Sequence, residues 1–254
     1  MNVIRYDNLR SFCYSNDRLI KGEIKGITID FFGLGGSAMP GDDYPNGLYY
    51  AGKGLIHIIP YTDPWNWMNP KAVTMTDEII DVLFEQYALP AGTPIVSTGG
   101  SMGGLCAIVY CRYAKRTPAA CVANCPVCDL PYHFTERPDL PRTLYAAYYT
   151  PGGDLLASLK GSSPLHIAAD LPDIPYTVFH CTADEAVNID AHSEKFVAAM
   201  RAAGKKIGFH KVPDRGHCAL TPEAWELYRQ CICKGAGLKK VCTAGTENGG
   251  FEST

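Results

Sequence analysis

Short apolar runs alternate with amphipathic stretches along most of the chain. The runs are rich in β-branched residues, and this composition predicts buried strands. The predicted strands are 27–32, 55–59, 94–98, 119–124, 176–180 and 206–212, with 9–14 as a further edge strand. Strands that alternate with helices indicate an α/β fold, in which a mainly parallel sheet carries helices on both faces.

Four segments between or after these strands carry helical patterns. In the first, Thr76 is the predicted N-cap, and the apolar side chains that share one helical face are Ile79, Ile80, Leu83, Phe84 and Tyr87. Segment 102–115 is apolar nearly all round, which predicts a central buried helix. Segment 189–203 ends at Gly204, and a last helix is expected over 221–233 because Thr-Pro-Glu forms a typical helix start.

Two regions break this alternation. Residues 129–173 are rich in Pro, Tyr and Leu without a strand pattern, and they lie between two core strands. We expect a small helical cap insertion there. Residues 235–254 lose apolar periodicity and predict a frayed tail. With these exceptions, the length of 254 residues fits one domain, 1–254.

Charge excludes several classes of partner. The net charge is −3, and acidic and basic residues are interspersed, so no basic face is expected for nucleic acid or for anionic membranes. Residues 1–16 contain no apolar signal region, which favours a cytoplasmic protein. The uncharged stretch 86–111 is long enough for a membrane span, but two prolines and two Gly-Gly pairs interrupt it and favour a strand, a turn and a helix.

Cysteine is abundant, but its number is odd. Eleven cysteines cannot all pair within one chain, which favours free thiols. A zinc site is an alternative because Cys121, Cys125 and Cys128 are closely spaced and His180 and Cys181 follow later. A second paired ligand cluster is not evident, so we interpret these residues as small buried side chains and expect no metal or other cofactor.

A candidate nucleophile lies between a predicted strand and the central helix. Gly99-Gly100-Ser101-Met102-Gly103 matches the pattern G-x-S-x-G, which forms a sharp strand-to-helix turn that exposes its serine. The flanking glycines permit the bend, and the helix N-terminus favours a developing negative charge. An ordinary glycine-rich turn is the alternative.

A serine hydroxyl needs a base and an orienting carboxylate to act as a nucleophile. Asp184 follows strand 176–180, and His217 lies in a loop after strand 206–212, so the chain order is serine, acid, histidine. We predict Asp184 as the acid and His217 as the base. The rival acids, which position alone leaves open, are Glu185, Asp190 and Asp214.

The reaction also needs two backbone donors for the oxyanion. The amide of Met102, directly after the serine, is one candidate. The second is expected from the glycine-rich loop 32–37 after an early strand, with Leu34 preferred and Gly35 as the alternative. This loop lacks the Lys-Ser/Thr pair of a phosphate-binding loop and the third spaced glycine of a dinucleotide fingerprint.

Three motifs together resemble the prolyl-oligopeptidase-like and esterase branch of the α/β-hydrolases. They are the elbow Gly-Gly-Ser101-Met-Gly-Gly, the stretch 184–196 and the loop Arg215-Gly-His217. The resemblance covers roughly 26–233 and implies an α/β-hydrolase fold, a Ser101-Asp184-His217 triad and hydrolysis of an ester or amide. Phe32 departs from the pattern because such proteins commonly place His before the first glycine of the oxyanion loop. The resemblance does not extend to the large N-terminal propeller of the oligopeptidases, for which we expect no room.

The favoured reaction is cleavage of small or medium acyl esters by a carboxylesterase. A small peptidase or amidase and a thioesterase are alternatives, and a catalytically silent binding protein is the non-enzymatic one. The expected partner is therefore a small-molecule ester or amide. We expect aromatic and Met side chains to line its pocket, although core packing is an equal explanation for them: Tyr61, Trp65, Trp67, Met68, Tyr148 and Tyr149.

Overall fold

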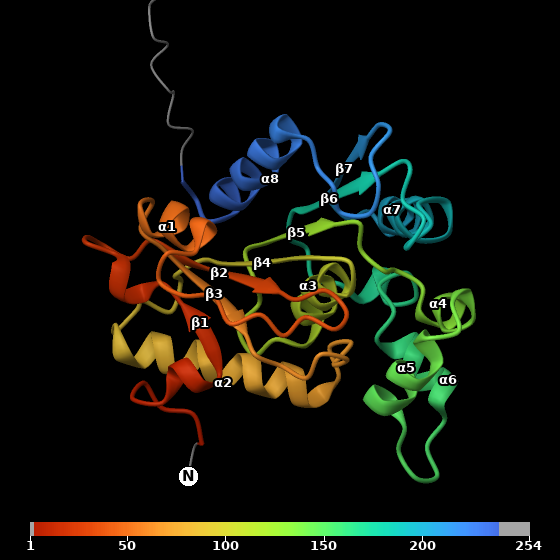
Figure 1. Cartoon of the computed structure of the whole chain (residues 1–254), viewed down its shortest axis with the longest axis horizontal. Coiled ribbons are helices and arrows are strands. Elements are labelled where there is room, and N and C mark those ends of the chain that lie inside the picture. The colour runs from red at the N-terminus through yellow and green to blue at the C-terminus, as the bar shows by residue number, and fades with distance from the viewer. Residues whose placement is uncertain (1–2, 239–254) are drawn as a thin grey trace, which may run out of the picture.

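A seven-stranded sheet forms the centre of the computed structural model, which describes residues 3–238 (Figure 1). Its strands are β1 (Cys13–Ser15), β2 (Gly26–Phe31), β3 (Leu55–Pro60), β4 (Ile95–Gly100), β5 (Ala120–Asn124), β6 (Tyr176–Cys181) and β7 (Ile207–Val212). The spatial order is β1-β3-β2-β4-β5-β6-β7. All neighbours pair in parallel except β1, which runs antiparallel to β3 at the edge. The predicted mainly parallel sheet is confirmed.

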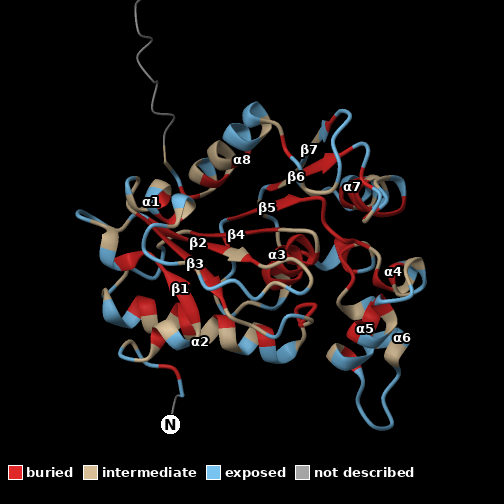
Figure 2. Cartoon of the chain, in the orientation of Figure 1, coloured by how far each residue is buried: buried red, intermediate tan, exposed pale blue. Residues whose placement is uncertain are grey.

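Helices cover both faces of this sheet, as the alternation of strands and helices predicts. On one face, α2 (Pro70–Gln86), α3 (Met102–Tyr113) and α7 (Lys195–Ala202) enclose the larger hydrophobic core. On the other, α1 (Pro45–Ala51) and α8 (Pro222–Gly235) enclose a smaller one. Figure 2 shows buried residues concentrated in the central strands and in α3. Residues 102–111 of α3 are all buried, which explains why its sequence has no polar face.

The start of α2 differs from the prediction. Thr76 is not its N-cap but lies inside the helix, where its hydroxyl donates to the Ala72 carbonyl. The helix begins at Pro70, and the Asn69 side chain caps it by accepting from the Ala72 amide. An Asn followed by Pro at the first helical position is the stronger start signal, because Pro needs no hydrogen-bond acceptor there.

Two other segments are less regular than expected. The edge segment 9–14 contains a 3₁₀ turn, Leu9–Ser11, before the short strand β1. A π-helical turn, Asp190–Glu194, precedes α7. The last helix has Thr221 as its N-cap, as predicted.

The region between β5 and β6 contains three short helices that pack on one another, α4 (Leu130–Glu136), α5 (Leu140–Tyr148) and α6 (Leu155–Gly161). They project to one side of the sheet in Figure 1, and a 3₁₀ turn, Ala168–Asp170, leads back to β6. That this region acts as a cap stays a prediction. Of the predicted tail, residues 239–254 lie outside the described part of the chain.

Stretch 86–111 is divided between the end of α2, strand β4 and helix α3. Within residues 3–238, no helix has the length and apolar composition needed to cross a membrane.

Candidate active site

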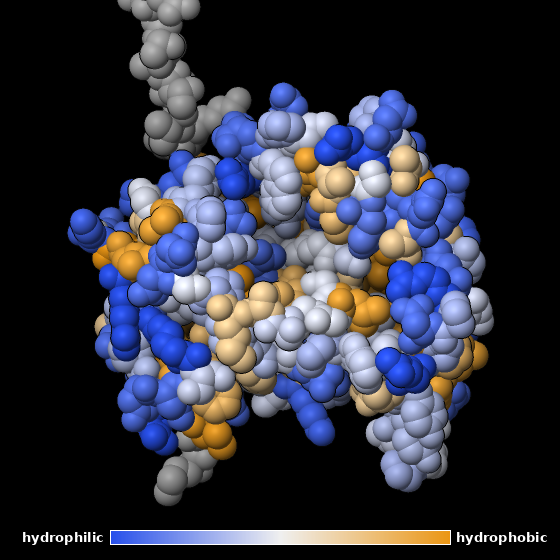
Figure 3. Space-filling model, viewed as in Figure 1, coloured by the Kyte–Doolittle hydropathy of each residue, from blue (hydrophilic) through white to orange (hydrophobic). Residues whose placement is uncertain are grey.

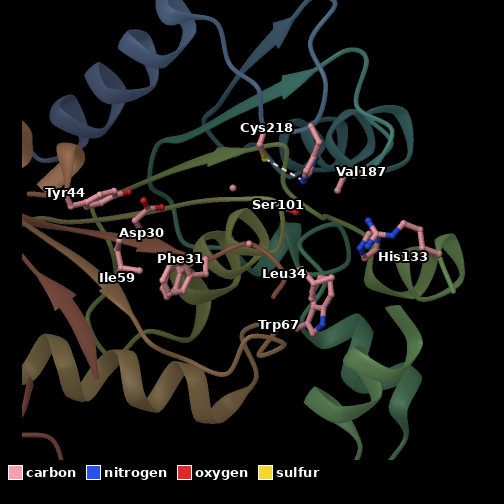
Figure 4. Close-up of a pocket in the computed structure, with 16 residues that line it drawn as sticks. Asp30, Phe31, Leu34, Tyr44, Ile59, Trp67, Ser101, His133, Val187 and Cys218 are labelled. Atoms are coloured by element: carbon pink, nitrogen blue, oxygen red, sulfur yellow. Dashed lines mark hydrogen bonds between the residues drawn. The ribbon is translucent and has the colours of Figure 1, made fainter. Parts of the chain in front are cut away.

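A pocket of about 520 Å³ opens at the carboxyl ends of the central strands (Figure 4). The loop after β2 and the turn after β4 both border it. The order of the strands reverses between β2 and β4: the chain goes from β2 to β3 on one side of this point and from β4 to β5 on the other. Such a switch point is where open α/β sheets bind ligands. The same face of the molecule is hollowed near its centre in Figure 3.

Ser101 occupies the sharp turn between β4 and α3 and lines the pocket. Its φ is 60° and its ψ is −125°, a strained backbone conformation for a residue with a side chain. The Ser101 amide donates to the Asn124 carbonyl at 2.9 Å, which anchors the turn to β5. Two hydrogen bonds, from the amides of Gly104 and Leu105 to the Ser101 carbonyl, start the helix.

Glycines make this turn sterically feasible. A Cβ atom on Gly99 would lie 2.3 Å from the Gly103 carbonyl oxygen, and one on Gly103 would lie 2.0 Å from the Phe31 carbonyl oxygen. Both separations are far below van der Waals contact, so any larger residue would force β2, β4 and α3 apart. The glycine pattern around Ser101 is therefore a packing requirement of the elbow.

Asp184 and His217 are in direct contact beside Ser101. His217 Nδ1 and Asp184 Oδ2 are 2.7 Å apart. The other carboxylate oxygen accepts from the amides of Ala186 and Val187, each at 2.9 Å, and His180 Nε2 lies 3.4 Å from Oδ2. These donors fix the orientation of a buried carboxylate. The carboxylate in turn fixes the tautomer of His217, because Nδ1 must carry the proton that it donates.

The pKa values of this pair shift in opposite directions. Burial raises the pKa of Asp184, but hydrogen bonds from His180, His217 and the Val187 amide outweigh burial and leave it well below its ordinary range. Burial lowers the pKa of His217, but the hydrogen bond and charge of Asp184 outweigh burial and raise this pKa above its ordinary value of 6.5. The rival acids Glu185, Asp190 and Asp214 are all exposed.

No hydrogen bond joins the side chains of Ser101 and His217 in residues 3–238. Both residues line the pocket, yet the hydrogen bond of His217 Nε2 in residues 3–238 is with Cys218 Sγ, at 3.7 Å (Figure 4). Within the same residues Ser101 Oγ makes no hydrogen bond. Catalytic hydrogen bonds are often long in a ligand-free site and tighten when substrate binds.

Of the two predicted oxyanion donors, Met102 directly follows Ser101 in the chain, and Leu34 lies in the loop after β2. Met102 is the first residue of α3, so its amide points out of the helix end. Leu34 is half-buried and lines the pocket. The amide of Gly35 donates to the Pro64 carbonyl at 3.0 Å, so this alternative donor is already engaged. Phe32, which departs from the family pattern, stacks on Tyr61 with ring centroids 6.4 Å apart.

Only one of the six predicted pocket residues borders this pocket among the described residues. That residue is Trp67. Tyr148 is buried and donates from its hydroxyl to the Trp67 carbonyl, and Met68 is also buried. Tyr149 is exposed and stacks on Tyr145, with ring centroids 4.4 Å apart. The structure likewise does not bring Tyr61 or Trp65, both partly exposed, to the pocket.

Polar residues that sequence reasoning missed take their place. Asp30 on β2 lines the pocket, and burial raises the pKa of this carboxyl to about 6. Its sequence signal was a single acid within an apolar strand. His133 and Arg137 reach the pocket from α4 and the residue that follows it. The Arg137 guanidinium binds Asp139 through two hydrogen bonds of 3.0 and 2.7 Å, so its charge is balanced.

His133 belongs to a buried polar cluster with Glu136 and His192. Glu136 Oε2 lies 2.6 Å from His133 Nδ1 and 3.1 Å from His192 Nε2. Burial raises the pKa of Glu136, but the two histidines outweigh it and lower that pKa to about 2. His192 Nδ1 accepts from the amides of Cys128 and Asp129, so the ring holds α4 in place beside the pocket.

Three groups of side chains in residues 3–238 have ligand atoms close enough for a metal ion. They are Cys125-His217-Cys218, Cys125-His180-Asp184 and His133-Glu136-His192. The first two contain Cys125 from the predicted cysteine cluster. Cys121 and Cys128 belong to none of the three, and both are buried.

Comparison with known proteins gives one family and several similar structures. The model of the prolyl oligopeptidase family matches residues 66–230. No curated protein matches the chain in a sequence search.

Esterase and peptidase structures resemble this chain at low sequence identity. Thermogutta terrifontis esterase 2, phosphoramylated by tabun, is 21% identical with a TM-score of 0.62, and 87% of each chain is covered. Porphyromonas gingivalis dipeptidyl peptidase 4 is 16% identical with a TM-score of 0.65, covering 85% of this chain and 32% of that one. An acylaminoacyl peptidase bound to a chloromethyl ketone is 15% identical with a TM-score of 0.62, covering 78% of this chain. The chain spans about one third of the length of that peptidase, 33%. These likenesses show an α/β-hydrolase fold.

Proposed function

Because the chain belongs to the prolyl oligopeptidase family and is a serine hydrolase, we propose that it cleaves carboxylic esters with Ser101, Asp184 and His217 as its catalytic triad. The observation that carries this proposal is the 2.7 Å contact between His217 and the buried Asp184, beside a serine in a strained elbow. Each residue has the role that serine hydrolysis requires of its type.

In the proposed reaction, His217 Nε2 removes the proton of Ser101 as its oxygen attacks the ester carbonyl. In this step the contact of Nε2 with Ser101 replaces its present contact with Cys218. Asp184 keeps Nδ1 protonated and stabilises the imidazolium ion. His217 then protonates the leaving alcohol. In the second half of the reaction, water attacks the acyl-enzyme, and His217 takes the proton of the water and returns it to Ser101 as the acid leaves.

The oxyanion of each tetrahedral intermediate would be held by the amides of Met102 and Leu34. The Met102 amide also lies at the positive end of α3, where negative charge is favoured. The engaged Gly35 amide supports Leu34 over Gly35. No step of this mechanism uses a cofactor.

The choice of an ester rests on substrate placement. Amide hydrolysis needs a poor leaving nitrogen to be protonated within a tightly held complex, whereas an ester tolerates looser placement. On the side of the pocket near α4, the lining residues are Trp67, His133 and Arg137. Asp139 already neutralises the Arg137 guanidinium, so this side offers no free positive charge to hold the carboxylate end of a peptide. The similarity to the Thermogutta esterase also supports this choice, because it covers 87% of this chain and 87% of that esterase.

A peptidase is the second candidate because Asp30 places a carboxyl group in the pocket. No basic side chain forms an ion pair with it within residues 3–238, so it could bind a free amino terminus. The likeness to dipeptidyl peptidase 4 supports this alternative at the level of fold.

We predict that a peptide ester is hydrolysed far faster than the amide of the same peptide. Both substrates share the acyl group, so the comparison isolates the leaving group. A medium-chain nitrophenyl ester serves as the positive control, and kcat/KM is measured for all three. If the peptide amide reacts within about tenfold of its ester, a difference of about 1.4 kcal/mol in barrier, the peptidase assignment replaces ours.

A second prediction concerns pH. Below its pKa His217 is protonated and cannot accept the serine proton, so activity requires the neutral form. Since the pKa of His217 is raised above 6.5, kcat/KM should rise with pH through an inflection above that value. The profile is measured with a neutral ester, whose own charge does not change. A flat profile between about pH 5 and 8 would contradict His217 as the base.

A further inference from the structure

His217 and Cys218 line one wall of the pocket, and the buried Cys125 lies close to both. Cys218 follows His217 directly, and its Sγ lies 3.7 Å from His217 Nε2 (Figure 4). Cys125, the residue after β5, provides a second thiol, which is fully buried. The ligand atoms of Cys125, His217 and Cys218 all lie within 4.8 Å of one another. The ester hydrolysis proposed above uses neither thiol.

These separations fit a tetrahedral zinc ion. Zn–S bonds of about 2.3 Å and Zn–N bonds of about 2.0 Å imply ligand atoms roughly 3.5 to 3.8 Å apart. The Cys218–His217 pair already has this spacing, at 3.7 Å. The third ligand atom, Cys125 Sγ, lies within 4.8 Å of both.

Both kinds of ligand are oriented for a metal. Asp184 accepts the proton of His217 Nδ1, which leaves the lone pair on Nε2 free for a metal. A carboxylate behind a histidine in this way is the usual support of a zinc ligand. Cys125 Sγ accepts from the amides of Cys181 and Cys218, both at 3.4 Å. These N–H donors favour the thiolate, but the neighbouring Cys218 thiol and burial outweigh them and raise the pKa of Cys125, so the ion itself has to displace the thiol proton.

We propose that Cys125, His217 and Cys218 bind a thiophilic divalent cation, zinc, and that this ion reversibly inhibits the hydrolase. Three protein ligands leave the fourth position for water or for a group in the pocket. Two thiolates and one imidazole select zinc over the oxygen-seeking magnesium and calcium. On binding, the two thiols release their protons to solvent, and no electron is transferred.

Inhibition follows because the metal occupies the lone pair of Nε2 that would accept the serine proton. This half of the inference rests on the proposed role of His217 as the base. Metal binding itself does not, since it requires only the three ligand side chains. The two halves are therefore measured separately.

The binding test uses the full chain, stripped of metal and kept reduced with a phosphine. We expect Co²⁺ to bind with a near-ultraviolet thiolate-to-metal charge-transfer band, and Zn²⁺ to displace it at one equivalent per chain. Cys218→Ser and Cys125→Ser should each raise the Zn²⁺ dissociation constant by about 10- to 100-fold or more. Circular dichroism of each variant checks its fold, and Cys218→Ala provides a second variant at the pocket-facing thiol.

Two variants serve as matched controls. Cys231→Ser removes a partly buried thiol of α8 that belongs to none of the three candidate clusters, and should leave the band unchanged. Glu136→Gln removes a ligand of the cluster without thiols and should also leave it unchanged. Binding without the charge-transfer band, or Zn²⁺ affinity retained in both Cys218 variants, would overturn the site.

The inhibition test adds Zn²⁺ to the active enzyme. Ester hydrolysis should fall as the site fills and recover with a chelator, in wild type and in Cys231→Ser alike. Full activity at a Zn²⁺ concentration that has displaced Co²⁺ and abolished its band would overturn inhibition but leave the site. Binding measured in Ser101→Ala keeps this result independent of the proposed catalysis.

Discussion

Ser101→Ala is expected to lower kcat/KM for a nitrophenyl ester by about 10⁴-fold or more, because it removes the attacking oxygen. The substitution deletes one partly exposed atom at the pocket, and Ser101 Oγ makes no hydrogen bond within residues 3–238. The fold and its melting temperature should therefore remain close to those of the wild type. Steady-state kinetics and circular dichroism measure the two outcomes.

Ser158→Ala is a suitable control for this variant. Its hydroxyl donates to the Asp154 carbonyl on α6, away from the pocket, so activity should not change. If Ser101→Ala folds normally and retains about a tenth of the wild-type activity, a loss of only about 1.4 kcal/mol, Ser101 is not the nucleophile.

Asp184→Asn is expected to lower kcat by about 10⁴-fold, the loss known for this change in a serine protease triad. The amide has nearly the same size, but it can present an N–H to His217 Nδ1 and favour the wrong tautomer. In the wild type, Asp184 Oδ2 lies 2.7 Å from that nitrogen. The loss should appear in kcat more than in KM, because Asp184 is not among the residues that line the pocket.

Three exposed acids provide the controls. Glu185→Gln, Asp190→Asn and Asp214→Asn should each change kcat by less than about threefold, since surface substitutions have small effects. A larger loss in Asp214→Asn than in Asp184→Asn would move the acid to the histidine loop and refute our assignment.

The fold could be predicted because each central strand is buried on both faces. Such strands read as continuous apolar runs, and the five inner strands β2 to β6 are present as predicted. The partly exposed edge strand β7 is present too, and the ends of all six are shifted by at most two residues. The predicted α/β-hydrolase architecture and its prolyl-oligopeptidase-like resemblance are both confirmed. Helix α1 was missed because its seven residues are too few for a detectable apolar periodicity. Two of them, Gly47 and Ala51, have almost no side chain to contribute to such a pattern.

The pocket lining could not be predicted as well as the elbow. Ser101 lies in a local motif whose geometry follows from adjacent glycines, and the sequence order of Asp184 and His217 anticipates their contact. Their catalytic roles stay predictions. Asp30, His133 and Arg137 reach the pocket through tertiary packing of β2 and the α4 region, which sequence spacing does not encode. Aromatic composition instead favoured Tyr148 and Tyr149, of which one is buried and the other exposed.

The most direct test of the central claim is covalent labelling with a fluorophosphonate, followed by peptide mass spectrometry. Our account predicts one adduct per chain, located on Ser101, with loss of esterase activity in proportion to labelling. The Ser101→Ala protein should remain unlabelled under the same conditions. An adduct on another residue such as Cys218, or full esterase activity in protein labelled completely at Ser101, would contradict it.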